Sequence, residues 1–399
     1  MTLQVEARRM AGFAAIPAVG ALSPLLAIPA ITSEYGASGW AAIAFGQAFG
    51  TAFSLVVEMG WGLTGPQRVA RADRAESRHL YLRCVATQGV VFVGCAPVLI
   101  AVTVLGQSIF VGASVLAALG AAAVGFSPAW YFVGAGTPTQ VLLTDSLPKV
   151  VLTAVLAGAL VAGAPLWLYS AGTLLAALLA PVIGALIVGL EDVRLDRRTL
   201  ATDLRDQVSA LSGRVLVAAH LSAPTVLLGF AGAPALPLFA AADRLQKMLL
   251  TVLTTAPNSL QRWFGSDGPW VRKLQISLGL NGGIGLLAAV LFWAGAPAAA
   301  RALFSGEIAL SHGVAAVAAV SIPLLCLTRV TGNLGLVRVG RVGWVTGSAF
   351  VALLVVGLGV PLGAARGGAS GAWWAVAAGL TVMLAIQGCG LWRVRHEHS

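Results

Sequence analysis

The sequence predicts an all-α polytopic membrane protein with about twelve transmembrane helices, arranged as two six-helix lobes around a central cavity. Three observations lead to this fold class: the composition, the recurrence of long apolar runs, and the one-sided placement of basic residues. Of the 399 residues, 58% are apolar and only 10% are charged. Soluble domains carry about 25% charged residues. This chain therefore has too few charges to cover a water-exposed surface.

Apolar runs of roughly twenty residues, long enough to cross about 30 Å of hydrocarbon, recur from one end of the sequence to the other. The first run starts at Met10 and is longer than the apolar part of a signal peptide (about 7–15 residues), so we expect it to be a retained span. The predicted spans are 10–32, 39–64, 80–105, 109–133, 139–163, 166–190, 212–231, 234–261, 272–296, 309–334, 342–363 and 370–392.

Basic residues fall almost entirely on one side of these spans. With the N-terminus inside, nineteen of the 25 Lys and Arg residues are cytoplasmic, namely Arg8, Arg9, Arg68, Arg71, Arg74, Arg78, Arg83, Arg194, Arg197, Arg198, Arg205, Arg214, Arg262, Arg272, Lys273, Arg338, Arg341, Arg393 and Arg395. The outer loops hold only Arg301 and Arg366. This bias predicts a multi-pass protein of the cytoplasmic (inner) membrane with both termini in the cytoplasm. It also accounts for the formal net charge of +10 without nucleic acid as a partner.

The longest polar segment, 191–214, divides the spans into two sets of six. Its apolar residues recur at helical spacing among Arg and Asp, at Leu200, Leu204, Val208 and Leu211. This pattern is typical of an amphipathic helix at a membrane surface. We therefore predict an N-terminal lobe at 1–190, a cytoplasmic linker helix at 191–211 and a C-terminal lobe at 212–399. Gln67-Arg68 and Gln261-Arg262 end corresponding spans of the two halves, as parallel repeats would.

Polar residues inside three spans repeat every three or four positions, which places them on one helix face. These stripes are Gln47, Thr51, Ser54 and Glu58 on span two; Asp145, Lys149 and Thr153 on span five; and Asp243, Lys247, Thr251, Thr254, Asn258 and Arg262 on span eight. A charge at the bilayer centre costs about 2.5–3.5 kcal/mol or more, so the stripes are expected to face the bundle interior. They predict a hydrophilic central cavity. The alternative is that they only join helices through hydrogen bonds and ion pairs.

The charges inside the spans suggest separate roles. The predicted anion-binding residues are Lys149, Arg244, Lys247 and Arg329. The predicted ion-coupling residues are Glu58, Asp145 and Asp243, and the predicted polar lining of the cavity is Gln47, Thr51, Ser54, Thr251 and Asn258. His220 is a further titratable candidate, although a lone His among small apolar residues more often packs between helices.

Several function classes are disfavoured by what the sequence lacks. It has no phosphate-binding Gly-rich loop followed by Lys-Ser/Thr, so ATP is not expected to drive it directly. Its Cys84, Cys95, Cys326 and Cys389 are scattered without metal-ligand spacing, and we expect no metal and no cofactor. The outer loops are too short for the carboxylates of a membrane glycosyltransferase or polymerase, and we expect no enzymatic activity. A membrane scaffold without transport would not need the buried charges.

Four local sequences resemble the polysaccharide-transporter family of Wzx-type flippases, within the multidrug/oligosaccharidyl-lipid/polysaccharide (MOP) superfamily. The matching patches are Glu58-Met59-Gly60-Trp61-Gly62 with Gly65-Pro66-Gln67-Arg68-Val69-Ala70, then Pro128-Ala129-Trp130-Tyr131-Phe132-Val133-Gly134, Lys149, and Phe239-Ala240-Ala241-Ala242-Asp243-Arg244. The sequence departs from the family pattern at Glu58, where Asp is common, and at Val133, where Gln is frequent. No motif matches from Leu274 onward.

The resemblance implies a flippase that moves undecaprenyl-pyrophosphate-linked oligosaccharide, a precursor of surface polysaccharide such as lipopolysaccharide O-antigen, across the membrane. It implies alternating access driven by H⁺ or Na⁺, with the lipid-linked oligosaccharide, membrane lipids, the coupling ion and other polysaccharide-assembly membrane proteins as partners. The alternative is a proton- or sodium-coupled multidrug exporter of the same superfamily. Such an exporter should have a cavity dominated by acids and aromatic residues, whereas four candidate cations stand against three acids here.

Overall fold

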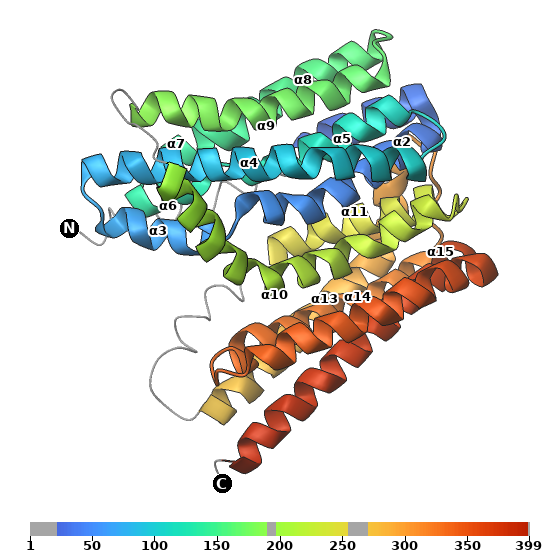
Figure 1. The fold of residues 1–399 in the computed structure, drawn as a ribbon. Coiled ribbons are helices and arrows are strands. Elements are labelled where there is room, and N and C mark those ends of the chain that lie inside the picture. Colours follow the sequence, from blue (N-terminus) through green and yellow to red (C-terminus); the bar gives the residue numbers. More distant parts are fainter. Residues whose placement is uncertain (1–21, 190–196, 254–269, 398–399) are drawn as a thin grey trace. The chain divides into compact units, whose positions relative to one another are not determined.

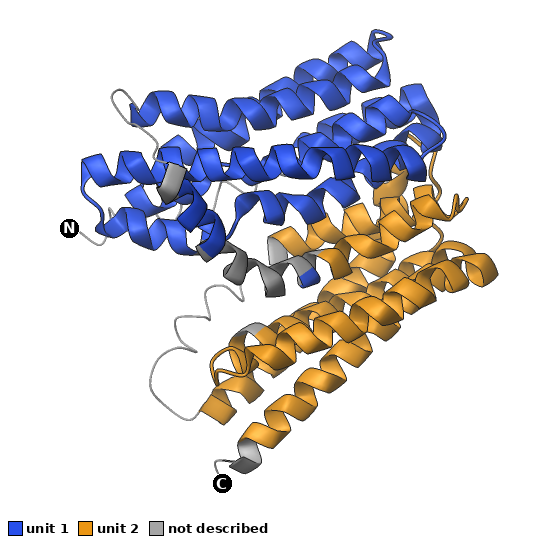
Figure 2. Ribbon diagram, viewed as in Figure 1, with its two compact units in different colours: residues 1–218 blue, residues 219–399 orange. Residues whose placement is uncertain are grey.

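The computed structural model describes residues 22–189, 197–253 and 270–397, and these residues form helices and short connections without a strand. The chain divides into two compact units, Met1–Ala218 and Ala219–Ser399 (Figure 2). The boundary between the units lies within helix α10 (Arg197–Phe230). The described part of the predicted linker belongs to this helix, whereas 191–196 and the start of the first predicted span lie outside the described residues.

Among the described residues, the N-terminal unit contains six spans, some of them interrupted, whose helices are labelled in Figure 1. Its elements are α2 (Leu22–Glu58), α3 (Trp61–Arg71), α4 (Arg74–Gly106), α5 (Val111–Ala123), the 3₁₀ turn η1 (Val124–Phe126), α6 (Ala129–Ala135), α7 (Pro138–Val141), the π-helical turn η2 (Leu142–Ser146), α8 (Leu147–Val161) and α9 (Leu166–Val188). Helix α2 contains spans one and two. The chain turns between them at Gly36, whose positive φ of 62° glycine adopts easily.

Helices α2 and α5 approach each other so closely that their backbones touch. A methyl group at Gly46 would lie 2.2 Å from the carbonyl oxygen of Ser114, and one at Gly50 would lie 2.1 Å from that of Ala118. The hydroxyl of Ser114 donates to the carbonyl of Ala42 on the facing helix at 2.8 Å. Small residues four apart are a common way to pack membrane helices, where hydrophobicity does not drive helix association.

The C-terminal unit continues from α10 through α11 (Leu236–Leu253), α13 (Trp270–Leu303), α14 (His312–Arg329), the π-helical turn η3 (Val330–Leu336) and α15 (Val342–Glu397). Helix α15 contains two spans, since its backbone leaves the helical conformation at Gly367 and Gly368. These two spans meet at Gly363 and Gly371, where a methyl group on either would lie 2.0–2.3 Å from the carbonyl oxygen of the other.

Eight helices of the described residues are long and apolar enough to cross a membrane. Two of these, α2 and α15, each contain two spans, and α10 and α11 supply the remaining two. Helices α10 and α11 are not among the eight. The apolar part of α10 is short, at Ala219–Phe230, and α11 carries the charged residues Asp243, Arg244 and Lys247. The all-helical fold with twelve spans confirms the class that the sequence predicts.

Two of the patches that resemble the flippase family form one aromatic core in the N-terminal unit. The ring centroids of Trp61 and Trp130 lie 5.4 Å apart, and Tyr81 stacks on Trp130 at 6.3 Å. A methyl group on Gly65 would lie 2.3 Å from the Trp130 ring, and one on Gly134 would lie 2.6 Å from the carbonyl oxygen of Pro66. These glycines therefore serve the close packing of α3 against α6.

Candidate functional site

A pocket of about 250 Å³ lies among four helices of the C-terminal unit, and we call it the C-terminal pocket. Each of the four helices contributes both apolar and polar side chains. The lining residues are His220, Leu221 and Pro224 of α10; Phe239, Asp243, Gln246, Lys247, Leu250 and Thr251 of α11; Ser321, Leu325 and Arg329 of α14; and Trp373, Val376 and Leu380 of α15.

Helix α11 carries the polar stripe that the sequence predicts, and its regular 3.6-residue repeat brings three of the predicted residues to the pocket. The Lys247 ammonium donates to an Asp243 carboxylate oxygen at 2.6 Å. The Thr251 hydroxyl donates to the Lys247 carbonyl at 2.8 Å. The Lys247 side chain stays 43% exposed, so an incoming group can reach its ammonium.

Arg329 enters the pocket from a second helix. It is the last residue of α14, directly before η3, and its side chain is half-buried. None of the carboxylates in the described residues forms an ion pair with it. A guanidinium inside a span is costly unless an anion or water compensates it. The arrangement therefore offers a cation to a ligand.

The pocket wall also contains polar nitrogens that the described residues leave unsatisfied. His220 and Trp373 are 4% and 2% exposed, and neither His220 Nδ1 nor Trp373 Nε1 has a hydrogen-bond partner among the described residues. Trp373 stacks on Phe239 with ring centroids 4.6 Å apart. Gln246 donates to the Ser321 hydroxyl at 2.5 Å, which joins α11 to α14. Buried polar groups are almost always paired, so these nitrogens are suited to a bound polar ligand.

Arg244 is the predicted cation of α11 that does not line the pocket. It follows Asp243 by one position, and adjacent residues on a helix point in directions about 100° apart. Its side chain is half-buried away from the pocket wall. Asn258, together with Thr254 and Arg262, lies outside the described residues.

The stripe of span two lies in the N-terminal unit. Two of its hydroxyls bond to their own helix, from Thr51 to the Gln47 carbonyl at 2.6 Å and from Ser54 to the Thr51 carbonyl at 2.8 Å. Glu58 is the last residue of α2. The helix is interrupted after it by Met59 and Gly60, which have left-handed φ values of 53° and 73°. Its carboxylate covers Gly62, at which a methyl group would lie 1.7 Å from Glu58 Oε1.

The stripe of span five is only partly on one face. Asp145 lies in the π-helical turn η2 and interacts with the Ser127 hydroxyl and the Lys149 ammonium. Lys149 is exposed on the surface of the described unit, whereas Thr153 is buried. Lys149 and Thr153 thus differ in burial although both lie in the regular helix α8.

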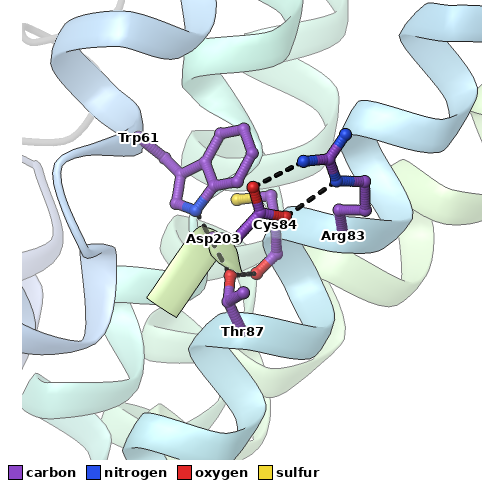
Figure 3. A network of polar contacts seen from close by, with 5 residues as sticks. All are labelled: Trp61, Arg83, Cys84, Thr87 and Asp203. Atoms are coloured by element: carbon purple, nitrogen blue, oxygen red, sulfur yellow. Dashed lines mark hydrogen bonds and ion pairs between the residues drawn. The ribbon is translucent and has the colours of Figure 1, made fainter. Parts of the chain in front are cut away.

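A buried polar network joins α4 to the first turns of α10 within the N-terminal unit (Figure 3). Arg83 donates through Nε to one Asp203 oxygen at 2.7 Å and through Nη2 to the other at 2.5 Å. Nearby, Trp61 Nε1 donates to the Thr87 hydroxyl at 3.2 Å, and that hydroxyl donates to the Cys84 carbonyl at 2.8 Å. Asp203 is 4% exposed, so the bidentate pair satisfies a carboxylate that water barely reaches.

Sequence reasoning missed Gln246, Ser321 and Trp373 as pocket residues. Gln246 lies one position before Lys247 and off the stripe, so its spacing gave no signal. Ser321 and Trp373 are single residues in apolar helices, and only their contacts with Gln246 and Phe239 reveal a role. No cluster of three or more His, Cys, Asp or Glu among the described residues is placed to hold a metal.

Solved structures with the same fold are transporters. An inward-facing multidrug resistance MATE family transporter of the MOP superfamily superposes with a TM-score of 0.66 at 13% identity, covering 96% of this chain and 94% of that chain. The lipid II flippase MurJ, in an inward closed conformation, gives 0.62 at 10% identity, covering 98% and 87%. A MATE structure in the bent conformation gives 0.51 at 14% identity, covering 98% and 94%. The chain has the fold of these transporters.

No family model and no curated protein matches the sequence. The likeness to MATE transporters and to MurJ is thus one of fold, extending over nearly the whole chain. Together with the long apolar helices, it supports a multi-pass membrane protein. Substrate and energy source have to be argued from the residues of this chain.

Proposed function

We propose that this protein is a flippase that exports an anionic, lipid-linked oligosaccharide of the undecaprenyl-pyrophosphate class across the cytoplasmic membrane, with both termini in the cytoplasm. The observation that carries the proposal is the pair of cations, Lys247 and Arg329, on facing helices of the C-terminal pocket. The sequence resemblance to Wzx-type flippases points to the same substrate class, and the fold is shared with a lipid II flippase.

The chemistry of the pocket suits a phosphate-bearing headgroup. Arg329 offers several N–H donors in a fixed fork, and Lys247 offers a movable point charge. Trp373 Nε1 provides a further donor, and His220 provides one when Nδ1 carries the proton. The apolar part of the wall, from Phe239 to Leu380, keeps water scarce, which strengthens each charge-assisted bond.

Ion coupling would use the acids of the spans, as the sequence predicts. Asp243 is paired with Lys247 in this structure, so an incoming phosphate and the Asp243 carboxylate would compete for one ammonium. Protonation of Asp243, or binding of Na⁺ to it, would release Lys247 to the substrate. In the N-terminal unit, Glu58 and Asp145 remain coupling candidates, and Lys149 remains a candidate anion ligand.

The test is export by purified protein in proteoliposomes containing a fluorescent undecaprenyl-pyrophosphate oligosaccharide, with variants Lys247→Ala and Arg329→Ala. Loss of one charge-assisted contact costs about 1.5–3 kcal/mol, so we expect transport at limiting substrate to fall roughly 10- to 100-fold in each variant. Arg301→Ala and Arg366→Ala, which remove exposed arginines elsewhere, are the matched controls. Unchanged transport in both pocket variants would refute the proposed role of the pocket.

A second function, ion-coupled export of cationic drugs, has one observation in its favour. The C-terminal pocket places the carboxylate of Asp243 beside the stacked rings of Phe239 and Trp373, and carboxylates with aromatic faces attract organic cations. The same vesicles, loaded with a fluorescent organic cation and given a proton or sodium gradient, separate the two. Transport of the cation that is abolished by Asp243→Asn, without transport of the lipid, would favour the drug exporter.

A further inference from the structure

A second pocket lies at one end of the N-terminal unit, formed by α3 and α4, and is independent of the C-terminal pocket. It has a volume of about 620 Å³ and is lined by Thr64, Gln67, Arg68, Arg71, Ala72, Glu76, Leu80 and Arg83. We propose that this arginine pocket binds a phosphate group, presented by the headgroup of an anionic phospholipid. Nothing in the proposed transport function requires it.

Two of the three guanidiniums are held in place before any ligand arrives. The Arg68 guanidinium lies over the Trp61 ring, 5.5 Å from its centroid, and Trp61 is itself fixed by its bond to Thr87. Arg83 is fixed by the bidentate pair with Asp203, and its third nitrogen points away from that carboxylate (Figure 3). Guanidiniums that are already ordered lose less entropy when they bind an anion.

The charge balance of the arginine pocket favours an anion with one negative charge. Arg68, Arg71 and Arg83 line it together with one carboxylate, Glu76, and Asp203 already neutralises Arg83. A single positive charge therefore remains in excess, which matches the single negative charge of a phosphodiester. The buried hydroxyl of Thr64 has no partner among the described residues and is available to donate to a phosphate oxygen.

The position of the arginine pocket indicates the source of the phosphate. It lies between the end of α3 and the start of the apolar span α4, where a lipid headgroup would sit. The bias of basic residues predicts that this end is cytoplasmic, and the cytoplasmic leaflet carries the anionic lipids that attract Lys and Arg. Arg68 and Arg71 are exposed, so a headgroup can reach them from the membrane surface.

The experiment measures lipid binding to the full-length protein in a neutral detergent, by native mass spectrometry and by thermal unfolding. The wild type is titrated with phosphatidylglycerol, with phosphatidylcholine of the same chains, and with inorganic phosphate. We expect one saturable phosphatidylglycerol with a rise in melting temperature, and no such response to phosphatidylcholine. Arg68→Ala/Arg71→Ala should weaken phosphatidylglycerol binding at least roughly tenfold, because each lost charge-assisted contact is worth about that factor.

Matched variants make the outcome decisive. Arg301→Ala/Arg366→Ala removes the same charge from exposed arginines that do not line the pocket and should bind as the wild type does. Arg68→Lys/Arg71→Lys keeps the charge and should bind between the wild type and the alanine variant. A response to inorganic phosphate alone would keep the phosphate site but overturn the lipid as its source. Equal binding by the wild type and the Arg68→Ala/Arg71→Ala variant would overturn the site.

Because this readout is equilibrium binding without transport, its failure is distinguishable from failure of the proposed flippase function. A protein that transports normally with both arginines replaced, but has lost the bound lipid, would support the arginine pocket as a separate site.

Discussion

At the scale of single residues, the pairing of Arg83 with Asp203 shows how a sequence with few charges uses them. Asp203 lies in the segment that the sequence identifies as a polar linker, yet it is 4% exposed and accepts two hydrogen bonds from Arg83. A buried carboxylate is tolerated only when its oxygens are satisfied. The pair therefore fixes the start of α10 on α4 within the N-terminal unit.

Asp203→Asn should destabilise the protein. The amide offers only one acceptor oxygen, and its NH₂ group would face the Arg83 donors, so one hydrogen bond and the charge attraction are lost. We expect a cost of about 1–3 kcal/mol, seen as a lower melting temperature in detergent. Asp243→Asn serves as a comparison and should change the melting temperature less, because the partner of Asp243, Lys247, has a side chain that is 43% exposed and can bond to water.

The reversed pair Arg83→Asp/Asp203→Arg is a stricter test of the same contact. If the attraction matters, the double variant should recover part of the stability that either single reversal loses. A double variant no more stable than the worse single variant would contradict this assignment.

Residue-level reasoning predicted part of the C-terminal pocket and missed part of it. Asp243, Lys247, Thr251 and Arg329 were found because charges and hydroxyls inside apolar spans stand out from their surroundings. Trp373 and Ser321 do not stand out, since tryptophan and serine are ordinary in membrane helices. Their role depends on contacts between helices far apart in the sequence, which no spacing rule reports.

At the scale of helices, glycine determines how closely spans approach. The four-residue spacing of Gly46 and Gly50 places both on the face of α2 that meets α5, and neither position has room for a methyl group. Many of the other glycines have open space around them, so the abundance of glycine alone did not show which helices pair.

Gly50→Ala should force α2 and α5 apart, because the new methyl would meet a backbone carbonyl that cannot rotate away. Overpacking of this kind costs about 1–3 kcal/mol, which thermal unfolding of the purified protein would report. Gly94→Ala in α4, where no atom lies within 4 Å of the added methyl, is the matched control and should be neutral or slightly stabilising. Equal melting temperatures for the two variants would refute the close contact.

Among the polar stripes, that of span eight has three residues that line one pocket. Along α11, spacings of four residues carry Asp243, Lys247 and Thr251 to one pocket. In span five, Lys149 is exposed and Thr153 is buried, although both lie in the regular helix α8. In span two the hydroxyls of Thr51 and Ser54 bond to carbonyls of their own helix.

At the scale of the whole molecule, the twelve spans followed from apolar length and charge bias. The membrane requires both features of any chain that spans it, so both can be read directly from the sequence. The aromatic core of Trp61, Tyr81 and Trp130 did not follow, since it joins three spans through ring contacts. Two of the four patches that resemble the flippase family thus lie in the packing of the N-terminal unit.

The orientation predicted by the basic residues is testable by cysteine labelling in intact cells. In a variant whose Cys84, Cys95, Cys326 and Cys389 are replaced by alanine, a cysteine at Ser108 should react with a membrane-impermeant maleimide. A cysteine at Ala75 should react only after the membrane is permeabilised. Both positions are exposed, and they lie at opposite ends of α4. If the cysteine at Ala75 reacts in intact cells and the cysteine at Ser108 does not, the predicted orientation is wrong.

The π-helical turn η3 has a consequence for span ten as a whole. A π-turn accommodates one residue more than an α-helix does, and η3 begins directly after Arg329. Deletion of one residue within Val330–Leu336 should therefore restore a regular helix without breaking it. Because the π-turn already absorbs the extra residue, the parts of the span before and after it should keep their facing, whereas a one-residue deletion in a regular helix would turn them by about 100° relative to each other. Span ten can therefore lose one residue at this turn while its two ends present the same residues to their neighbours.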